Sequence, residues 1–352
     1  MNNKVSTIRL LIVEDSLTYK EYYRQLFSAY PTIQIVSMLS SGEEAMNQIS
    51  ILKPDIIIMD YLLPGMDGLA TTKKIMLNYP TSIIIVSAKL HRDNIEDTFS
   101  ALEAGAMALI EKPDGLDSPR GEQQGKDLVD TIVQIAKAKL FKNRKESETE
   151  QKKRDKPECN LFPNHLPKHI KYVMIGSSTG GPDALQRIFA QVKENIPFSI
   201  LVVQHIAKGF LASFIVWLRK TAKVKIEIAG DQTIPLPGTV YFAPDAYQMG
   251  IDKQGKICLK TDESDYSNCP AVSYLFSSFI PFASDSITIL LSGMGQDGVK
   301  EMLELKQKGS FTVIQDSESS FIYGMPQEAK KINAHCIESS PEEIAEMLNK
   351  WV

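Results

Sequence analysis

One glycine-rich segment carries residue types that suit either acyl transfer or phosphate binding. Residues 173–185 read VMIGSSTGGPDAL, in which an apolar run enters a turn holding Ser177 and Ser178, and Pro182 opens a predicted helix. A Gly-x-Ser-x-Gly turn between strand and helix presents the Ser178 hydroxyl at the carboxyl edge of a sheet. A turn of this kind can also bind a phosphate with its backbone N–H groups. The segment alone leaves both interpretations open.

The neighbouring residues lack what the common phosphate-binding turns require. A dinucleotide-binding turn needs glycine where Ser178 stands and an acid at the end of the next strand, but that predicted strand ends in Gln204 and His205. A Walker-type loop needs a lysine after its last glycine, where this chain has Pro182. A serine nucleophile needs a base that removes its proton, so the position of His205 favours the nucleophile.

A histidine and an aspartate follow two later predicted strands. His205 ends the strand 199–204, and Asp297 lies in SGMGQDG just past the strand 286–292. The carboxyl ends of parallel strands meet at one edge of a sheet. We therefore expect Ser178, His205 and Asp297 to form a catalytic triad, because a triad is defined by geometry and role rather than by chain order.

Alternatives remain for two of these roles. Asp316 also follows a predicted strand and competes with Asp297, although the glycines around Asp297 suit a close approach of the backbone. His335 lies near the end of an element and competes with His205 as the base.

An oxyanion formed at Ser178 would need hydrogen-bond donors nearby. The N–H of Thr179, the residue after the nucleophile, is the natural first donor. An N–H of the turn Gly293-Met294-Gly295 could supply a second. Judged by its residue type alone, Met294 could equally well be a buried core residue with no role at the oxyanion.

A second group of candidates ends the predicted strands of the N-terminal half. Glu14 and Asp15 end the first strand, Asp60 the third, Ser87 the fourth and Lys112 the fifth. Three carboxylates at one edge repel one another unless a divalent cation lies between them, and hard oxygen ligands favour Mg²⁺. The metal would let a phosphoryl group approach Asp60, and Lys112 offers a positive charge to the same group.

Short apolar runs alternate with amphipathic segments through both halves of the chain. Runs with little polar alternation are typical of strands buried on both faces of a parallel sheet. The fold class predicted is α/β, with two doubly wound parallel-sheet domains. The predicted strands are residues 8–13, 33–39, 55–60, 82–88, 107–112, 171–176, 199–204, 286–292 and 311–315.

Further signals place the limits of the domains. Residues 141–168 crowd charges of both signs with three prolines, a composition typical of a flexible linker. We therefore predict domains at 1–140 and 169–352. In the second domain, residues 248–259 are predicted to form a β-hairpin, and the segment Ser340-Pro341-Glu342-Glu343 is predicted to cap a final helix.

Composition excludes several classes of protein. A net charge of −4 and a charged fraction of 23% do not indicate a nucleic-acid or membrane-surface binder. The longest uncharged regions are broken by prolines, so no membrane insertion is expected. The four cysteines are scattered without close pairs, a pattern that suits a reducing cytoplasm.

Residues 7–140 resemble the receiver domain of bacterial response regulators through the segments LIVEDS, MDYLLPGMDG, VSA and EKP. The resemblance implies a flavodoxin-like fold and phosphorylation by a chemotaxis histidine kinase. It also implies these roles: Asp60 as phosphoacceptor, Glu14, Asp15 and Asp60 as Mg²⁺ ligands, and Ser87 and Lys112 as the residues that sense the phosphoryl group.

Residues 171–352 resemble the catalytic domain of the chemotaxis protein-glutamate methylesterases. The matching segments are IGSSTGG, VVQH with GF following, LPGTVYFAP, LLSGMGQDG and QDSESSFIYGMPQEA. The resemblance implies a Rossmann-like α/β domain that demethylates glutamate methyl esters on methyl-accepting chemotaxis receptors, releases methanol and needs no cofactor for that step. It also implies deamidation of receptor glutamines, control by the receiver, and these roles: Ser178 as nucleophile, His205 as base, Asp297 as orienting acid, with Thr179 and Met294 near the oxyanion.

The chain departs from both families at several positions. Leu109 replaces the aromatic residue that receivers often carry three residues before the lysine. In the second domain the departures are expected on substrate-facing loops, where they would alter the choice of receptor. They are Ile206, Ala207, Trp217, Gln248, Cys269 and Ser273.

Two other functions compete with a methylesterase. One is a catalytically silent adaptor that binds receptors while its receiver competes for phosphoryl groups. The other is a receiver-governed hydrolase of a different acyl ester. Labelling of Ser178 by a serine-directed fluorophosphonate separates the adaptor from both enzymes, and methanol release from methylated receptors separates the two enzymes.

Overall fold

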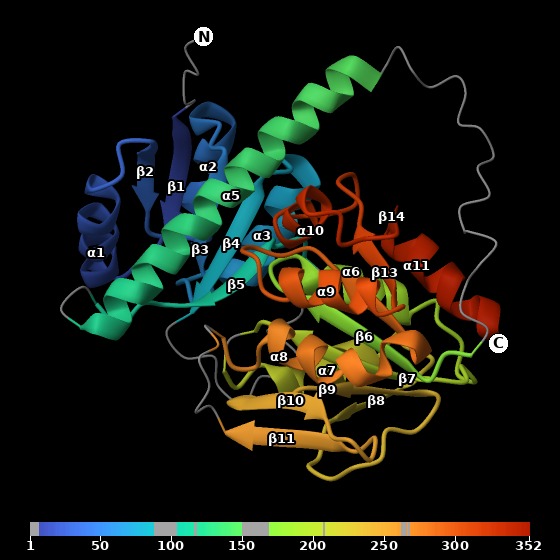
Figure 1. The fold of residues 1–352 in the computed structure, drawn as a ribbon. Coiled ribbons are helices and arrows are strands. Elements are labelled where there is room, and N and C mark those ends of the chain that lie inside the picture. Colours follow the sequence, from blue (N-terminus) through green and yellow to red (C-terminus); the bar gives the residue numbers. More distant parts are fainter. Residues whose placement is uncertain are drawn as a thin grey trace. The chain divides into compact units, whose positions relative to one another are not determined.

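The computed structural model describes residues 7–87, 104–115, 118–149, 169–206, 208–261, 266 and 268–352. Contacts divide the chain into two compact units, Met1–Asn143 and Arg144–Val352. Each unit is built around a parallel sheet with helices packed on it (Figure 1). The prediction of two parallel-sheet α/β units is confirmed.

The first unit has five strands. Its elements in chain order are β1 (Ile8–Val13), α1 (Leu17–Ser28), β2 (Ile33–Leu39), α2 (Gly42–Leu52), β3 (Ile56–Asp60), α3 (Gly68–Asn78), β4 (Ser82–Ser87), β5 (Ala108–Glu111) and α5 (Pro119–Thr149). The strand order is β2-β1-β3-β4-β5, and every neighbouring pair is parallel. This is the flavodoxin-like order. β3 and β4 are buried throughout, whereas the edge strands β2 and β5 are only partly buried.

The helix α5 extends further than the sequence analysis predicted. It continues to Thr149, through the first nine residues of the segment that was predicted as a flexible linker. The physical reason is helix propensity: residues 137–149 consist largely of Lys, Ala, Leu, Arg and Glu and contain neither glycine nor proline. The rest of the predicted linker, 150–168, lies outside the described residues.

The second unit has a larger sheet and a hairpin. Its elements are β6 (Tyr172–Ser177), α6 (Gly181–Phe189), β7 (Ser199–Gln204), α7 (Leu211–Arg219), β8 (Lys225–Ile228), β9 (Thr239–Phe242), β10 (Tyr247–Ile251), β11 (Ile257–Thr261), α8 (Val272–Ser278), β12 (Ser286–Leu290), α9 (Val299–Gln307), β13 (Phe311–Gln315), α10 (Met325–Lys331), β14 (Ile337–Ser339) and α11 (Pro341–Leu348). Two short 3₁₀ helices cover Ile280–Asp285 and Asn349–Trp351.

The seven strands of this sheet are all parallel, in the order β14-β13-β12-β6-β7-β9-β8. The first strand, β6, lies in the middle, and the chain adds strands on one side through β7 and on the other side through β12. The sheet therefore has a topological switch point beside β6, where ligands of open α/β sheets bind at the carboxyl ends of the strands. The short strands β8, β9 and β14 were not predicted.

Two local predictions in this unit are confirmed. β10 and β11 pair antiparallel as a hairpin, with Asp252 Oδ1 accepting from the N–H groups of Gln254 and Lys256 in the turn. The final helix α11 begins with a capping box, in which Ser340 and Glu343 each accept the other's backbone N–H.

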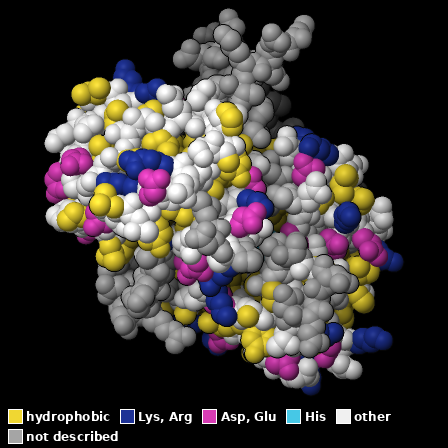
Figure 2. Space-filling model, turned by 90° about the vertical axis from the view of Figure 1, so that its left-hand side faces the viewer, with side chains coloured by type: hydrophobic (Ala, Val, Ile, Leu, Met, Phe, Trp, Pro, Cys, Tyr) yellow, Lys and Arg dark blue, Asp and Glu magenta, His cyan; other side chains and the backbone are white. Residues whose placement is uncertain are grey.

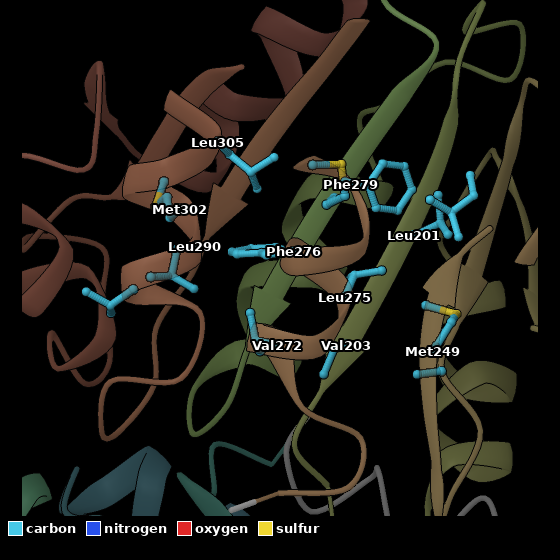
Figure 3. Close-up of a cluster of buried hydrophobic side chains, with 14 of the residues drawn as sticks. Leu201, Val203, Met249, Val272, Leu275, Phe276, Phe279, Leu290, Met302 and Leu305 are labelled. Carbon is cyan, nitrogen blue, oxygen red and sulfur yellow. The ribbon is translucent and has the colours of Figure 1, made fainter. Parts of the chain in front are cut away.

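Helices cover both faces of the second sheet. On one face, α8 and α9 form a buried apolar cluster with the sheet and with Met249 of the hairpin, as Figure 3 shows for Phe276, Leu290 and Met302. On the other face, Phe242 of β9 makes edge contacts with Phe189 of α6 and Phe214 of α7. α8 is thus fixed by its packing, which matters because its first residues face the site.

The surface carries mixed charge. In the view of Figure 2, basic and acidic side chains are interspersed with apolar ones, as expected for a chain of net charge −4. None of the helices in the described ranges combines the length and the apolar content of a membrane span.

Candidate active site

The turn after β6 exposes one of its two serines. Ser177 is fully buried, and its hydroxyl donates to Gln204 Oε1 at 2.7 Å. Ser178 is half-buried and follows the strand, so its side chain is the one available to a substrate. Gly180 then adopts a φ of 81°, which glycine tolerates without the steric cost of a side chain, and α6 begins at the next residue.

The structure brings His205 and Asp297 together. His205 Nε2 lies 2.9 Å from Asp297 Oδ2. This bond leaves Nδ1 as the ring nitrogen that can accept a proton from Ser178. The backbone also joins the base to the turn, because the His205 N–H donates to Ser177 O at 2.9 Å. Within the described ranges no hydrogen bond connects the Ser178 hydroxyl to the imidazole, so that contact stays a prediction; catalytic hydrogen bonds are often long before substrate binds.

The two alternative residues lie in other environments. Asp316 accepts the N–H groups of Glu318 and Ser319 in the turn after β13. His335 Nε2 lies 3.8 Å from Glu338 Oε1. Asp297 and His205 are therefore the acid and the histidine that the fold pairs.

Asp297 is held by backbone donors at the start of α8. Its Oδ2 accepts the Val272 N–H and its Oδ1 accepts the Ser273 N–H, each at 2.8 Å. Burial alone would raise the pKa of Asp297, but the hydrogen bond and positive charge of His205 and the donors of Ser273 outweigh it and lower the pKa to about 2. Asp297 is thus ionised at neutral pH and fixes the orientation of the imidazole.

Some of the family departures support Asp297 rather than face a substrate. Gln248 is fully buried, donates to Asn268 O at 2.7 Å and accepts the Ala271 N–H at 2.7 Å, which fixes the turn before α8. The Ser273 hydroxyl accepts the Gly298 N–H beside Asp297. Trp217 is buried in α7 and stacks on Phe214.

The expectation of substrate-facing loops was therefore wrong for Trp217 and Gln248, which are buried in α7 and β10. Ser273 is half-buried in the first turn of α8, and its contact with a substrate stays a prediction. Cys269 is half-buried in the turn before α8, and Ala207 lies outside the described residues.

A donor for an oxyanion stands next to Ser178. Among the described residues, no hydrogen-bond partner takes the N–H of Thr179. The Gly293 N–H, by contrast, donates to Ile322 O at 3.1 Å and is used within the fold. Met294 is half-buried in the turn that follows. The geometry favours Thr179 as the first donor, as the sequence predicted.

Ser292 and Gly293 pack against the nucleophile turn. Sequence reasoning missed Ser292 and named Gly293 only as part of a turn that could supply a donor. The Ser178 N–H donates to Ser292 O, and the Ser292 hydroxyl donates to Thr179 O at 2.8 Å. A Cβ on Gly293 would lie 2.8 Å from Ser178 Cβ, so only glycine allows this approach. The SGMG segment was the available signal, because glycines beside a strand end indicate close packing of backbone.

The first unit gathers the predicted acidic residues at one edge of its sheet. Oxygens of Glu14, Asp15 and Asp60 all lie within 4.8 Å of one another. Lys112 Nζ lies 2.7 Å from both Glu14 Oε2 and Asp60 Oδ2, and its approach to Asp60 has hydrogen-bond geometry. Ser87 is buried at the end of the neighbouring strand β4.

Burial dominates the electrostatics of this pocket. It raises the pKa of Glu14 to about 7 and also raises the pKa of Asp60, in both cases against the lowering effect of Lys112. The pKa of Lys112 is raised, because the hydrogen bonds and charges of the two carboxyls outweigh its burial. The ammonium group thus stays charged between two closely spaced carboxyls.

The same residues fit a divalent cation. Glu14 Oε2 is buried, and the ammonium nitrogen of Lys112 lies 2.7 Å from it. Three carboxylates whose oxygens lie this close together provide the hard oxygen ligands that Mg²⁺ prefers. Glu14, Asp15 and Asp60 would hold the ion.

The two units define a class of protein in which a receiver-type domain accompanies an α/β domain with a hydrolase-type strand-to-helix turn. The family model described as CheB methylesterase matches residues 173–348, and the one described as response regulator receiver domain matches residues 10–118. A protein-glutamate methylesterase/protein-glutamine glutaminase of Syntrophus aciditrophicus is 38% identical over 346 residues, covering 97% of this chain and 98% of that protein. The chain belongs to the CheB methylesterase family.

A second curated relative agrees with this assignment. A protein-glutamate methylesterase/protein-glutamine glutaminase of Nitrosospira multiformis is 34% identical over 346 residues, covering 98% of this chain and 97% of that protein. Among solved structures, the CheB methylesterase catalytic domain of Thermotoga maritima is 33% identical and covers 52% of this chain and 99% of that domain, with a TM-score of 0.49.

The low pKa of Asp297 predicts a pH-dependent contribution to stability. A carboxyl with a pKa of about 2 when folded and 3.8 when unfolded stabilises the fold above about pH 4, and this contribution is lost as the pH falls towards about 2. We expect the free energy of unfolding of the wild type, relative to Asp297→Asn, to fall by about 2 kcal/mol over that range.

Urea unfolding followed by tryptophan fluorescence measures this difference in the second unit alone. Both tryptophans of the chain, Trp217 and Trp351, lie there. A difference between wild type and Asp297→Asn that stays constant between about pH 5 and about pH 2 would contradict the account of this carboxyl.

Proposed function

We propose that the chain hydrolyses methyl esters of glutamate side chains on the cytoplasmic helices of methyl-accepting chemotaxis receptors, and that its receiver controls this activity. The observation that carries the proposal is the bond between His205 and Asp297 beside the half-buried Ser178. Relatives of the same domain order support the substrate, since the names they carry are protein-glutamate methylesterase/protein-glutamine glutaminase. The catalytic domain is residues 169–352 and the receiver is residues 1–140.

Acylation would proceed by attack of Ser178 Oγ on the ester carbonyl while His205 Nδ1 takes the hydroxyl proton. Asp297 stays ionised, because its pKa is about 2, and stabilises the imidazolium. The Thr179 N–H donates to the oxyanion, and a donor in this position stabilises the transition state by about 3 kcal/mol. The amide of Met294 is the proposed second donor.

The intermediate collapses when His205 returns its proton to the departing methoxy oxygen. Methanol leaves, and the receptor glutamate is joined to Ser178 by an ester. Water then attacks this ester as His205 takes one of its protons, and the carboxylate is released with Ser178 restored. Deamidation of a receptor glutamine follows the same steps with ammonia as the leaving group, and neither reaction calls for a cofactor in this domain.

The receiver would accept a phosphoryl group on Asp60 from a chemotaxis histidine kinase. Mg²⁺ bound by Glu14, Asp15 and Asp60 would supply positive charge to the phosphoryl oxygens. Lys112 already lies 2.7 Å from Asp60 and would contact the modified side chain. Ser87 lies buried at the adjacent strand end and is the proposed hydroxyl partner of the phosphoryl group.

Replacement of the nucleophile tests the catalytic assignment. Ser178→Ala is expected to lower methanol release from methyl-labelled receptor membranes by at least about 10³-fold, because the variant lacks the proposed nucleophile and the other serine of the turn, Ser177, is fully buried. Ser284→Ala removes an exposed hydroxyl far along the chain and serves as the matched control with wild-type turnover. Substantial turnover by Ser178→Ala would rule out the proposed mechanism.

Replacement of the phosphoacceptor tests the control by the receiver. With acetyl phosphate and Mg²⁺ present, we expect methanol release by the wild type to rise by about 5–150-fold, the range of typical coupling free energies. Asp60→Asn is expected to show no rise, whereas Asp130→Asn, which changes an exposed carboxyl on α5, responds like the wild type. A full response by Asp60→Asn would show that Asp60 is not the acceptor.

A further inference from the structure

The side chain of Gln204 joins the backbones of the proposed nucleophile and base. Its Nε2 donates to Ser178 O at 2.9 Å and to His205 O at 2.8 Å. Its Oε1 accepts from the Ser177 hydroxyl at 2.7 Å. Both N–H groups of the amide are therefore used, and the residue is only 4% exposed.

This connection begins where the sheet stops. β6 ends at Ser177 and β7 ends at Gln204, and these two residues are register partners. At this end of the two strands, a backbone hydrogen bond runs from the His205 N–H to Ser177 O. The hydrogen bonds of the Gln204 amide continue this cross-strand connection by one residue beyond each strand, to Ser178 and His205.

The neighbouring glycine makes room for this amide. A Cβ on Gly181 would lie 2.2 Å from Gln204 Oε1 and 2.8 Å from Ser177 Cβ. Gly181 is the first residue of α6, where any other residue would push the amide away from the two carbonyls. Gly181 and Gln204 thus form one arrangement, in which the absent side chain of the glycine leaves room for the amide.

Burial of apolar surface does not account for a glutamine here, because leucine would fill nearly the same volume. Without the amide, Ser178 O would still accept the Gly181 N–H at 2.8 Å. His205 O would lose the donor that holds the base beside the turn. The hydrogen bonds of Gln204 thus fix the position of Ser178 relative to His205.

We propose that Gln204 is a positioning residue, which sets the separation between Ser178 Oγ and the His205 imidazole through their main-chain carbonyls. The inference rests on the proposed roles of Ser178 and His205. It assigns Gln204 no contact with substrate, so it predicts an effect on the chemical step and not on substrate binding.

The test uses the full-length protein with two substitutions and two readouts that need no receptor. Gln204→Leu removes both donors, and Gln204→Glu keeps the acceptor for Ser177 while placing a carboxylate oxygen against two carbonyl oxygens. The readouts are kcat and KM for p-nitrophenyl acetate and the rate of fluorophosphonate labelling at Ser178. We expect kcat and the labelling rate to fall about 100-fold, with KM within about twofold of wild type and the larger loss in Gln204→Glu.

Thr288→Val controls for the loss of a buried hydrogen bond elsewhere in the same sheet. Thr288 is fully buried in β12, and its hydroxyl bonds Ser310 at 2.8 Å, away from the nucleophile turn. This variant is expected to lose stability in urea and to keep the wild-type kcat. Tryptophan fluorescence gives the folded fraction of every variant.

Three results would overturn the proposal: wild-type kcat in both Gln204 variants, a loss of rate that only matches the unfolded fraction, or a change confined to KM. A wild type that reacts with both probes but releases no methanol from methylated receptors would refute the proposed substrate and leave the role of Gln204 standing.

Discussion

The hydrogen bond between His205 and Asp297 is the interaction on which the candidate site depends. It joins residues that follow two different strands, β7 and β12, on opposite sides of β6. A histidine paired with an ionised carboxylate is held in one orientation and keeps one ring nitrogen for proton transfer. Here Nε2 faces the acid, so Nδ1 is the nitrogen left for Ser178. The topology explains why the pair forms at all, because strand order reverses beside β6 and brings the two strand ends to either side of the nucleophile turn.

Backbone N–H groups, more than side chains, hold this pair in place. Val272 and Ser273 offer their N–H groups to Asp297, and α8 can present them because Val272 packs over Gly176 at the end of β6. A Cβ on Gly176 would lie 2.3 Å from a Val272 methyl group, so the first glycine of the turn serves the acid as well as the nucleophile. The buried cluster around Phe276 then fixes the helix on the sheet (Figure 3). The chemistry proposed for the site thus rests on the core packing of one short helix.

The sequence predicted much of this, and its failures have physical reasons. Central strands such as β4 and β7 were predictable because both faces are buried and their runs are apolar. The short strands β8 and β14 carry too few residues to show a period. Ser178, His205 and Asp297 could be proposed from the sequence because each follows a predictable strand, and strand ends of a parallel sheet meet. The roles of Gln248, Ser273 and Ser292 could not be found, because their partners are main-chain groups distant in sequence, which no residue spacing encodes.

The central claim is that Ser178 reacts with the help of His205 and the Thr179 N–H. A crystal structure of the full-length protein after reaction with a fluorophosphonate tests it most directly. The account predicts phosphorus bonded to Ser178 Oγ, a phosphoryl oxygen about 3 Å from the Thr179 nitrogen, and the His205 ring bonded to Asp297 with Nδ1 towards Ser178. An adduct on another residue, or an imidazole turned away from Ser178 in the adduct, would contradict it.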